Sequence, residues 1–376
     1  MGIRKTFQFR LYPTKKQVNA FQSVLDSCRW VYNKTLETKK NAWTERKESI
    51  SYYGMSKFLT QWKQEKPDLY DTHSQCLGDA VSRVDLAFKA FFRRVKKGDI
   101  PGYPRFKGSD GYSSITYSQS GYKIVDNRLK LSKIGSVRIK KHREIEGVIK
   151  SVNIRRVGAK WYAAFSCEIT QPVLLTKVEA VVGIDVGLAS FATLSNGEKI
   201  DNPRFFRSEE KKLAKAQRRL IKAIKGSIDR KKQKKKVTNI HTKIANKRKD
   251  FAHKLSRKLV NQYQVIVFEK LDIKNMMDDH TEVFGHKLNK SISDVAWNQF
   301  MNFTSYKAGY AGRTVVFVNP RNTSKMCSRC GQIVDKDLSC RVHSCSCGLV
   351  LDRDHNASIN ILALGMKSLA KSLNAL

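Results

Sequence analysis

Three carboxylates lie at the ends of apolar segments that give no structural reason for a charge. Asp185 lies within VVGIDVGL, Glu269 ends QVIVFE, and Asp354 lies in LDRDHNASINIL at the start of a predicted helix. A carboxylate beside a buried strand is costly unless it is paired or binds a metal. Three such oxygen donors suit Mg²⁺. Two of these ions, roughly 4 Å apart, can activate a water and stabilise the leaving oxygen in phosphodiester hydrolysis.

The alternative is that these groups have structural roles. Asp354 would then cap the helix that follows it, and Glu269 would be a salt-bridge partner. Asp352 competes with Asp354 for the metal role, and it could instead cap that helix or orient Arg353. The occurrence of all three carboxylates in a strongly basic protein favours the magnesium site.

Four closely spaced cysteines form a metal-binding pattern. Each of two thiol pairs is followed by a glycine, and 14 residues separate the pairs, which is typical of a tetrahedral zinc ribbon. Such a zinc is structural because four thiolates leave no position for water. The second pair has a one-residue gap, which is tighter than usual, so Cys340 and His343 are alternative ligands; a chance cluster of buried thiols is the other alternative. The predicted ligands are Cys327, Cys330, Cys345 and Cys347.

The composition indicates a polyanionic partner. The 376 residues include 72 Lys and Arg against 33 Asp and Glu, for a net charge of +39. A charge this large opposes the compact state unless a polyanion neutralises it, and nucleic acid is the obvious one. Charge-driven solubility and an anionic membrane surface are weaker alternatives. No apolar run is long enough to span a membrane, and the isolated thiols Cys28, Cys76 and Cys167 suggest a reducing, cytoplasmic compartment.

The first half of the chain combines alternating strands with helices. Residues 3–11 alternate as a strand, Thr14 can cap a helix, and a second helix should end at Gly98. From about 112 to 171 short alternating segments, including a hairpin that turns at Gly158, predict a small β-barrel. The composition changes at 171–178, which we interpret as a domain boundary.

The second half contains the segments that would position the carboxylates. Strands are expected over 180–200, 264–271 and 313–320, with helices near 292–311 and 355–373. Residues 207–258 predict a helical hairpin with 21 Lys and Arg against 4 Asp and Glu. Its apolar stripe would be Leu213, Leu220, Ile221 and Ile224, and KKQKKK at 231–236 would be its solvated tip. The surrounding charge favours a phosphate-contacting surface over an ordinary solvated face.

These residues together resemble the TnpB/OrfB family, the RNA-guided nucleases of bacterial and archaeal insertion sequences, which are relatives of the type V CRISPR effectors. The resemblance extends over essentially the whole chain, and its most specific block is the last. The matching stretches are FQFRLYPTKKQ (7–17), HSQCLGDAVSRVDLAFKAFFRRVKKG (73–98), GYPRFK (102–107), GIDVGLASFATLSNG (183–197), NPRFFRSEEKKLAKAQRRL (202–220), IANKRKDFAHKLS (244–256), VIVFEKLDIKNM (265–276), SYKAGYAGRTVVFVNPRNTSKMCSRCG (305–331) and HSCSCGLVLDRDHNASINIL (343–362).

The resemblance implies an α/β multidomain protein. Its RNase H-like RuvC nuclease domain would span 180–323 and 351–376, with the zinc ribbon inserted at 324–350. An N-terminal β-barrel, the wedge domain, would span 1–13 and 99–172, with a helical recognition domain inserted at 14–98. Asp185, Glu269 and Asp354 match the family's catalytic carboxylates.

The activity implied is RNA-guided, Mg²⁺-dependent cleavage of double-stranded DNA. A guide RNA from the element's own end would supply sequence recognition, while the protein reads a short target-adjacent motif. The protein would be monomeric within its RNA complex, in a prokaryotic cytoplasm near the nucleoid. The alternatives are a nuclease-silent RNA-guided repressor, a transposition protein that acts on DNA alone, and a simpler RuvC-like nuclease that needs no guide.

Residues that contact nucleic acid are chosen by position and chemistry, since amide and guanidinium groups can pair with base edges. Ordinary surface contacts are an equally good interpretation of each one. The candidates are Tyr52, Lys57, Gln75, Asp79, Arg83, Arg105, Phe106, Lys107, Arg218 and Arg219.

Overall fold

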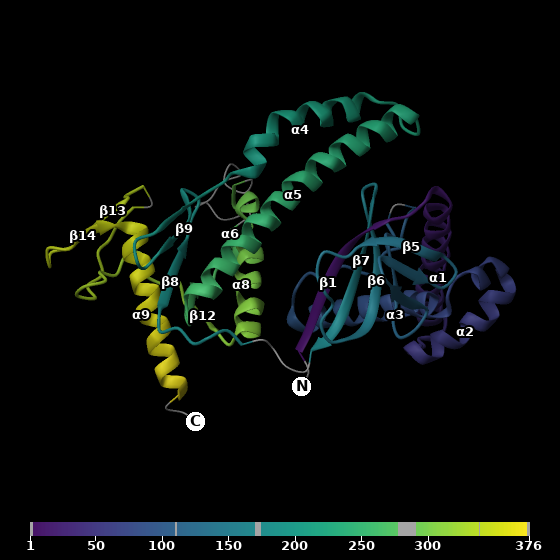
Figure 1. Ribbon diagram of the computed structural model, residues 1–376, viewed down its shortest axis with the longest axis horizontal. Helices are drawn as coiled ribbons and strands as arrows, with labels where there is room; N and C mark the ends of the chain where they lie inside the picture. Colours follow the sequence, from purple (N-terminus) through teal and green to yellow (C-terminus); the bar gives the residue numbers. More distant parts are fainter. Residues whose placement is uncertain (1–2, 110, 170–173, 277–290, 338, 374–376) are drawn as a thin grey trace. The chain divides into compact units, whose positions relative to one another are not determined.

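The computed structural model describes the chain except for residues 1–2, 110, 170–173, 277–290, 338 and 374–376. It divides into two compact units, Met1–Gln171 and Pro172–Leu376, and the division lies where the composition changes. Figure 1 shows the elements of both units. Within the described residues, no helix combines the length and the apolar character that crossing a membrane requires.

The first unit is built on a seven-stranded antiparallel sheet with the order β2-β6-β7-β1-β5-β4-β3. Apolar side chains that alternate along β1, including Phe7, Phe9 and Leu11, are buried beneath the helices of the same unit. The hairpin between β6 and β7 turns at Gly158, which has the positive φ that such a turn favours. The strands are β1 (Ile3–Tyr12), β2 (Ser114–Tyr117), β3 (Tyr122–Val125), β4 (Arg128–Leu131), β5 (Gly135–Lys140), β6 (Val148–Val157) and β7 (Lys160–Ile169).

The sequence predicts a small β-barrel, and the strand pairings in the structure leave the sheet open. Its end strands are β2 and β3, and no strand pairing joins them among the described residues. The outer edge of β2 is instead covered by a helix, since Arg83 donates to the Ser114 carbonyl at 3.0 Å and to Thr116 Oγ1 at 3.2 Å. A side chain therefore satisfies polar groups at an edge that would otherwise invite another strand.

Three helices and a 3₁₀ turn lie between β1 and β2 in the chain. Thr14 and Gln17 form a reciprocal capping box at the start of the first helix, and Gly98 ends the third in the left-handed conformation. Sequence analysis did not identify the second helix, whose buried side chains are only Met55 and Trp62. These elements are α1 (Lys15–Arg46), α2 (Tyr52–Glu65), the 3₁₀ helix η1 (Pro67–Asp71) and α3 (Ser74–Lys97).

The second unit contains a five-stranded mixed sheet with the order β10-β9-β8-β11-β12. The strand β11 pairs in parallel with β8 and β12, and β9 runs antiparallel to β8. The strands are β8 (Val181–Val186), β9 (Ser190–Leu194), β10 (Lys199–Asp201), β11 (Val265–Glu269) and β12 (Thr314–Val318), and a separate two-stranded ribbon is formed by β13 (Val342–Ser344) and β14 (Val350–Asp352).

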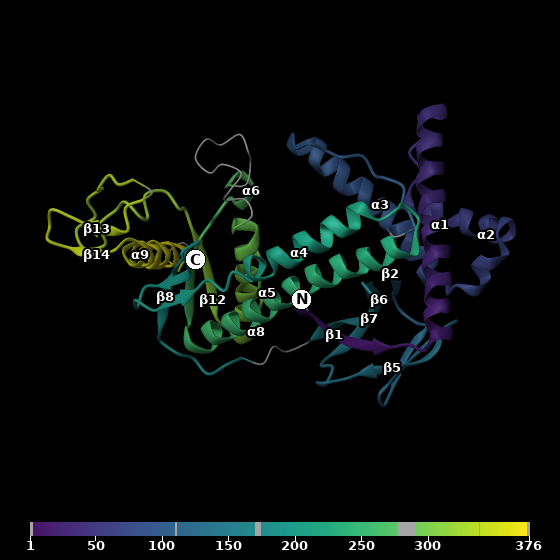
Figure 2. The same cartoon turned by 90° about the horizontal axis from the view of Figure 1, so that it is seen from above.

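Helices cover this sheet, and α9 crosses it at very short range. A Cβ atom built at Gly183 of β8 would stand 2.2 Å from the Ser358 carbonyl oxygen, and one at Gly365 would stand 2.5 Å from Val267. Figures 1 and 2 both show α9 alongside β8. The helices are α4 (Phe205–Lys222), α5 (Ile228–Gln262), α6 (Ile273–Met276), α8 (Trp297–Ala311) and α9 (Arg353–Leu373), and residues 291–295 are also helical.

The predicted basic hairpin consists of α4 and α5, but its turn lies earlier than expected. The chain reverses at 223–227, where Gly226 has φ +88° and Ser227 caps α5, so KKQKKK lies inside α5. The hairpin core contains Leu213, Ala216, Ile240 and Ile244, whereas Ile221 and Ile224 are 77% and 80% exposed. Of the predicted apolar stripe, Leu213 is buried and Leu220 is half-buried. Arg230 closes the tip by donating to the carbonyls of Leu220 and Ala223.

Candidate active site and metal centre

Two of the predicted carboxylates lie at the carboxyl ends of the adjacent strands β8 and β11 in the second sheet. Their parallel register pairs Phe268 with Ile184, so Glu269 and Asp185 are the next residues on adjacent strands. Burial and the neighbouring charges of Glu269 and Asp354 raise the pKa of Asp185 well above its ordinary value, while Arg353 opposes this effect. Glu269 and Asp354 are therefore close enough to Asp185 to raise its pKa.

Glu269 is held by a buried hydroxyl. Thr323 is 3% exposed, and its Oγ1 donates to Glu269 Oε1. Burial raises the pKa of Glu269, and the hydrogen bond from Thr323 opposes the rise. The hydroxyl therefore stabilises the charged carboxylate and fixes the orientation of one of its oxygens.

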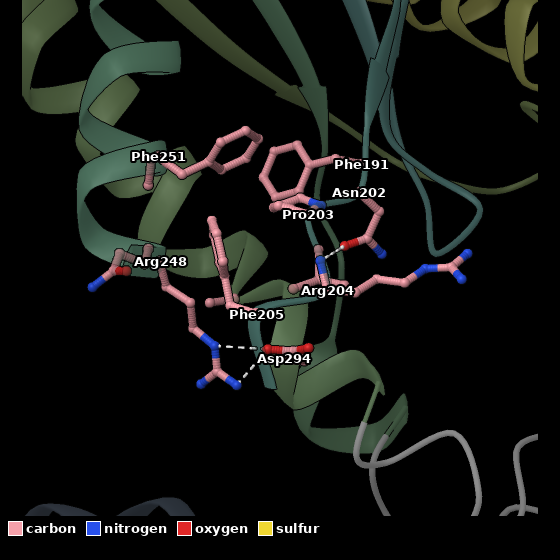
Figure 3. A pocket seen from close by; sticks show the side chains of 12 residues that line it. Phe191, Asn202, Pro203, Arg204, Phe205, Arg248, Phe251 and Asp294 are labelled. Atoms are coloured by element: carbon pink, nitrogen blue, oxygen red, sulfur yellow. Dashed lines mark hydrogen bonds and ion pairs between the residues drawn. The ribbon is translucent and has the colours of Figure 1, made fainter. Parts of the chain in front are cut away.

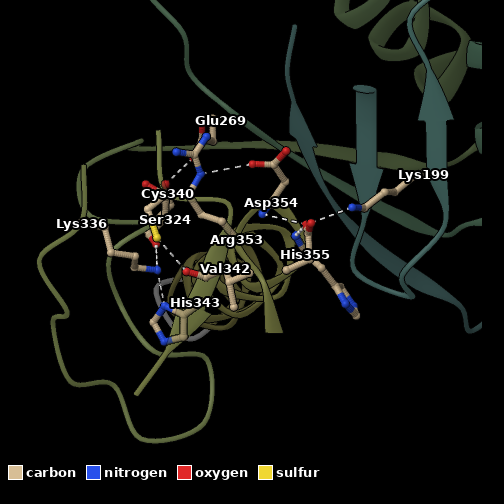
Figure 4. Close-up of polar contacts among 12 residues, drawn as sticks. Lys199, Glu269, Ser324, Lys336, Cys340, Val342, His343, Arg353, Asp354 and His355 are labelled. Carbon is tan, nitrogen blue, oxygen red and sulfur yellow. Dashed lines mark hydrogen bonds and ion pairs between the residues drawn. The ribbon is translucent and has the colours of Figure 1, made fainter. Parts of the chain in front are cut away.

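The structure distinguishes Asp354 from Asp352. Asp352 Oδ1 accepts hydrogen bonds from the N–H groups of Asp354 and His355, both at 3.1 Å, so Asp352 caps α9. Its other oxygen accepts from Lys199 Nζ at 2.7 Å. Burial raises the pKa of Asp352, but these hydrogen bonds lower it overall. Figure 4 shows Asp354 pointing away from the cap, with Arg353 Nε 3.4 Å from its Oδ1.

The predicted zinc ligands form a compact cluster. The sulfur atoms of Cys327, Cys330, Cys345 and Cys347 all lie within 4.8 Å of one another, and the Cys327–Cys347 and Cys330–Cys345 pairs are each 3.6 Å apart. Gly331 and Gly348 follow the two pairs with positive φ, as the turn of each knuckle requires. Four thiols at this spacing are compatible with one tetrahedral structural zinc.

The alternative ligands lie outside this cluster. Cys340 is exposed, and its Sγ contacts the Val342 carbonyl at 3.1 Å. His343 is fully buried, and Lys336 Nζ contacts its Nδ1. Figure 4 shows the side chains of Lys336, Cys340 and His343. Burial raises the pKa of Cys327, but backbone N–H groups and the side chains of His343 and Cys347 lower it to about 5. Neither Cys340 nor His343 belongs to the cluster of four sulfur atoms.

Two buried asparagines that sequence analysis did not single out join α9 to the cysteine cluster. Asn356 donates to the Met326 carbonyl at 2.8 Å and accepts from Ser328 N at 2.9 Å. Asn360 donates to the carbonyls of Thr323 and Met326. Because these amides are four residues apart, they lie on one helix face. Their signal in the sequence is two asparagines at helical spacing within an otherwise apolar segment.

The predicted nucleic-acid contacts differ in whether their side chains already bind other parts of the protein. Gln75 Oε1 accepts from the N–H groups of residues 118–120, and Arg83 pairs with Asp79 at 2.8 Å while it covers the edge of β2. These three side chains already have partners within the protein, and their selection as nucleic-acid contacts stays a prediction. Tyr52 is half-buried against the first core. The exposed candidates are Lys57, Arg105, Phe106, Arg218 and Arg219, and Lys107 is half-buried with its ammonium over the Tyr32 ring.

A pocket at the base of the basic hairpin is lined by an ion pair between half-buried Arg248 and buried Asp294. Arg248 of α5 binds Asp294 at 2.6 Å, and both Asp294 oxygens accept from the N–H group of Phe206 in the first turn of α4. Figure 3 shows these groups beside the rings of Phe191, Phe205 and Phe251. Asp294 therefore caps α4 from another segment, since Arg204 provides no side-chain cap.

Comparisons with known proteins match most of the chain. Residues 164–279 match a family model described as "Probable transposase" (OrfB), residues 297–361 match a Cas12f1-like TNB domain, and residues 1–48 match a helix-turn-helix model. In the last of these ranges the structure has a strand followed by one long helix.

Two relatives match nearly end to end. A "Putative RNA-guided DNA endonuclease" of Streptomyces pristinaespiralis is 36% identical, over 98% of this chain and 91% of that protein. InsQ of Escherichia coli, which carries the same description, is 31% identical over 97% of this chain and 93% of its own. The fold resembles Cas12f1 from its complex with guide RNA and target DNA, with a TM-score of 0.60 and 14% identity, over 96% of this chain and 98% of that one.

Proposed function

Because the chain belongs to the TnpB/OrfB family, we propose that it is an RNA-guided DNA endonuclease whose nuclease site is formed by Asp185, Glu269 and Asp354. The observation that supports this site is that Asp185 and Glu269 follow paired positions of adjacent parallel strands, while Glu269 and Asp354 both raise the pKa of Asp185. Such an arrangement is unfavourable without a bound cation, which suits a site that binds metal before it acts.

Mg²⁺ is the cofactor that this donor set suits, and bound Mg²⁺ would supply an activated water and stabilise the leaving oxygen of the phosphodiester. The chain's own groups orient the ligands. Thr323 holds one Glu269 oxygen, and Asp352 fixes the first turn of α9 from which Asp354 projects. Arg353 lies beside Asp354, where it balances part of the negative charge.

The five-stranded sheet with α9 across it supports an RNase H-like RuvC nuclease domain at 180–323 and 351–376. The four-thiol cluster supports a structural zinc within a ribbon at 324–350. The first unit would comprise the wedge domain, 1–13 and 99–172, and the recognition domain, 14–98. These assignments follow the family, and the antiparallel sheet with three inserted helices is compatible with them.

Guide RNA and double-stranded target DNA are the expected partners. The net charge of +39 and the exposed basic residues of α4 and α5 provide phosphate-binding surface, and the similar Cas12f1 fold is known from a complex with both nucleic acids. We expect one protein molecule in each RNA complex.

The test is to express the gene with its flanking DNA, purify the protein, sequence any bound RNA, and assay a plasmid library for cutting with Mg²⁺. A discrete bound RNA and guide-dependent cutting that is lost in Asp185→Ala would support the proposal. Bound RNA with no cutting across the whole library would favour a repressor. Cutting that does not need RNA would favour a guide-free nuclease or a transposition protein.

A further inference from the structure

The first unit contains a cavity that the proposed chemistry does not use. It has a volume of about 250 Å³ and lies between α1 and the loop that follows α3. Its walls come from both segments, with Phe106 on the loop facing residues of α1. The lining residues are Arg29, Trp30, Asn33, Lys34, Glu37 and Phe106.

The cavity is held in shape before any ligand arrives. Asn33 Nδ2 donates to the Lys107 carbonyl at 3.0 Å, and Asn33 Oδ1 accepts from Lys107 N at 2.8 Å. This pair of hydrogen bonds joins the loop to α1 one residue from Phe106. Lys107 Nζ lies 5.5 Å from the Tyr32 ring centroid, which adds a second contact between the loop and the helix. A preformed cavity binds with a smaller ordering cost than a loop that must close.

Two aromatic rings give the cavity apolar walls. Trp30 is partly buried, and its edge packs on Trp62 with the centroids 6.2 Å apart, so its position is fixed by the core. Phe106 is 54% exposed, although phenylalanine normally buries its ring. Exposed aromatic rings in a strongly basic protein are typical platforms for nucleobases, because every base has a π-face.

The polar groups of the cavity distinguish a base from a phosphate. Arg29 lines the cavity, and its Nη2 contacts Asp26 Oδ1 at 3.3 Å. The ion pair of Lys34 with Glu37, at 3.3 Å, adds a donor and an acceptor at the wall. Glu37 would repel a phosphate, whereas a base edge carries both donors and acceptors.

We propose that this cavity binds one unstacked nucleobase of the guide RNA or of the target DNA. The base lies against Trp30 and Phe106, and its polar edge meets the side chains of Arg29, Lys34 and Glu37. The inference rests on the proposed function only in requiring that the protein binds these nucleic acids. It assigns Trp30, Phe106 and Arg29 as binding residues that are remote in sequence from the nuclease carboxylates.

The experiment compares Phe106→Ala with Phe92→Ala, which removes a ring of the same type that is 62% exposed and does not line the cavity. Two affinities are measured without Mg²⁺: that of RNA-free protein for the RNA that co-purifies with it, and that of the RNA-loaded complex for a matching DNA duplex. We expect Phe106→Ala to weaken one of these affinities about 5- to 100-fold, the range for loss of one base–aromatic stack. Phe106→Tyr should restore it.

Asn33→Ala tests the same site without removing a ring, because it releases the loop from α1 and should weaken the same affinity. A loss in the RNA arm assigns the base to the guide, and a loss in the DNA arm assigns it to the target. Equal affinities for Phe106→Ala and Phe92→Ala in both arms, in proteins of unchanged melting temperature, would overturn the proposal while leaving the nuclease intact. Absence of any bound RNA, with no guided cutting, would instead contradict the proposed function.

Discussion

Gly183 of β8 and Ser358 of α9 are in backbone contact range, because a Cβ atom at position 183 would stand 2.2 Å from the Ser358 carbonyl oxygen. Asp185 lies two residues beyond Gly183, and Asp354 lies one helical turn before Ser358. The contact therefore fixes how far the third carboxylate stands from the first. The helix approaches the sheet this closely only because glycine has no side chain.

We expect Gly183→Ala to displace α9 and abolish DNA cutting. The clash is with backbone atoms, which cannot rotate away, so the substitution should also cost about 1–3 kcal/mol of stability. Thermal unfolding and plasmid cleavage are the measurements. Gly309→Ala is the matched control, since it has no neighbouring atom within 4 Å and lies in α8, where alanine should be neutral or slightly stabilising. Full cutting by Gly183→Ala would contradict the assigned role of the contact.

Asp354→Ala should affect cutting, whereas Asp352→Ala should mainly affect stability. Asp354→Ala should abolish cutting and leave the melting temperature and RNA binding nearly unchanged, because Asp354 does not cap the helix. Asp352→Ala removes the N-cap and should cost about 0.5–2 kcal/mol of stability while some cutting remains. Cutting is measured by cleavage time courses and stability by calorimetry, on both variants. Retained cutting in Asp354→Ala would exclude it from the nuclease site.

Cys330→Ser should lower the zinc content and the melting temperature together, since binding of a structural metal contributes directly to folding. Cys340→Ser is the control, because Cys340 is also exposed but lies outside the cluster. Zinc is measured by native mass spectrometry. If Cys330→Ser keeps a full equivalent of zinc, the four-thiol ligand set is wrong.

Replacing Arg218 and Arg219 by alanine should weaken RNA binding and make it less sensitive to salt. Each lost phosphate contact lowers the slope of log affinity against log salt by about 1. Affinities measured from low to moderate salt give the slope. The double variant Lys367→Ala, Lys371→Ala removes the same charge from exposed positions on α9 and should change the slope less. Equal slopes for the two double variants would mean that α4 has no special role.

Lys307 should make stability depend on alkaline pH. Its ammonium is buried and donates to the His253 carbonyl and to Ser256 Oγ, and burial together with Arg257 lowers its pKa to about 8. A lysine whose folded-state pKa is depressed binds fewer protons than the unfolded chain between about pH 8 and 10.5, so its contribution to stability rises across that window. The stability of wild type relative to Lys307→Met should therefore increase from pH 8 to pH 10. A difference that stays constant would contradict this.

The sequence predicts the elements that carry the carboxylates well because their signals are local. Apolar runs that end in Asp185 and Glu269, and the paired cysteines with their glycines, need no distant information. The sequence predicts the hairpin tip less well. The charge of KKQKKK suggests a solvated turn although the segment is helical, and the turn lies at Gly226 and Ser227.

Sequence analysis could not predict which polar groups contact each other when they are far apart along the chain. Thr323 and Glu269 are 54 residues apart, and Lys199 and Asp352 are 153 apart. The partners of Gln75 and Arg83, which are the loop at 118–120 and the edge of β2, likewise become their neighbours only after the sheet forms. The helix α2 was missed because it buries only two side chains.

The order of the strands has a consequence for synthesis of the protein. The sheet core joins β8 to β11 and β12, and the site is completed by α9, which begins well over a hundred residues after β8. At typical translation speeds of about 5–20 residues per second, several seconds or more separate the emergence of the first and last carboxylates. A nascent chain that already holds its basic surface therefore lacks part of the proposed nuclease site. If that site is correct, the chain cannot cut until α9 has docked on Gly183.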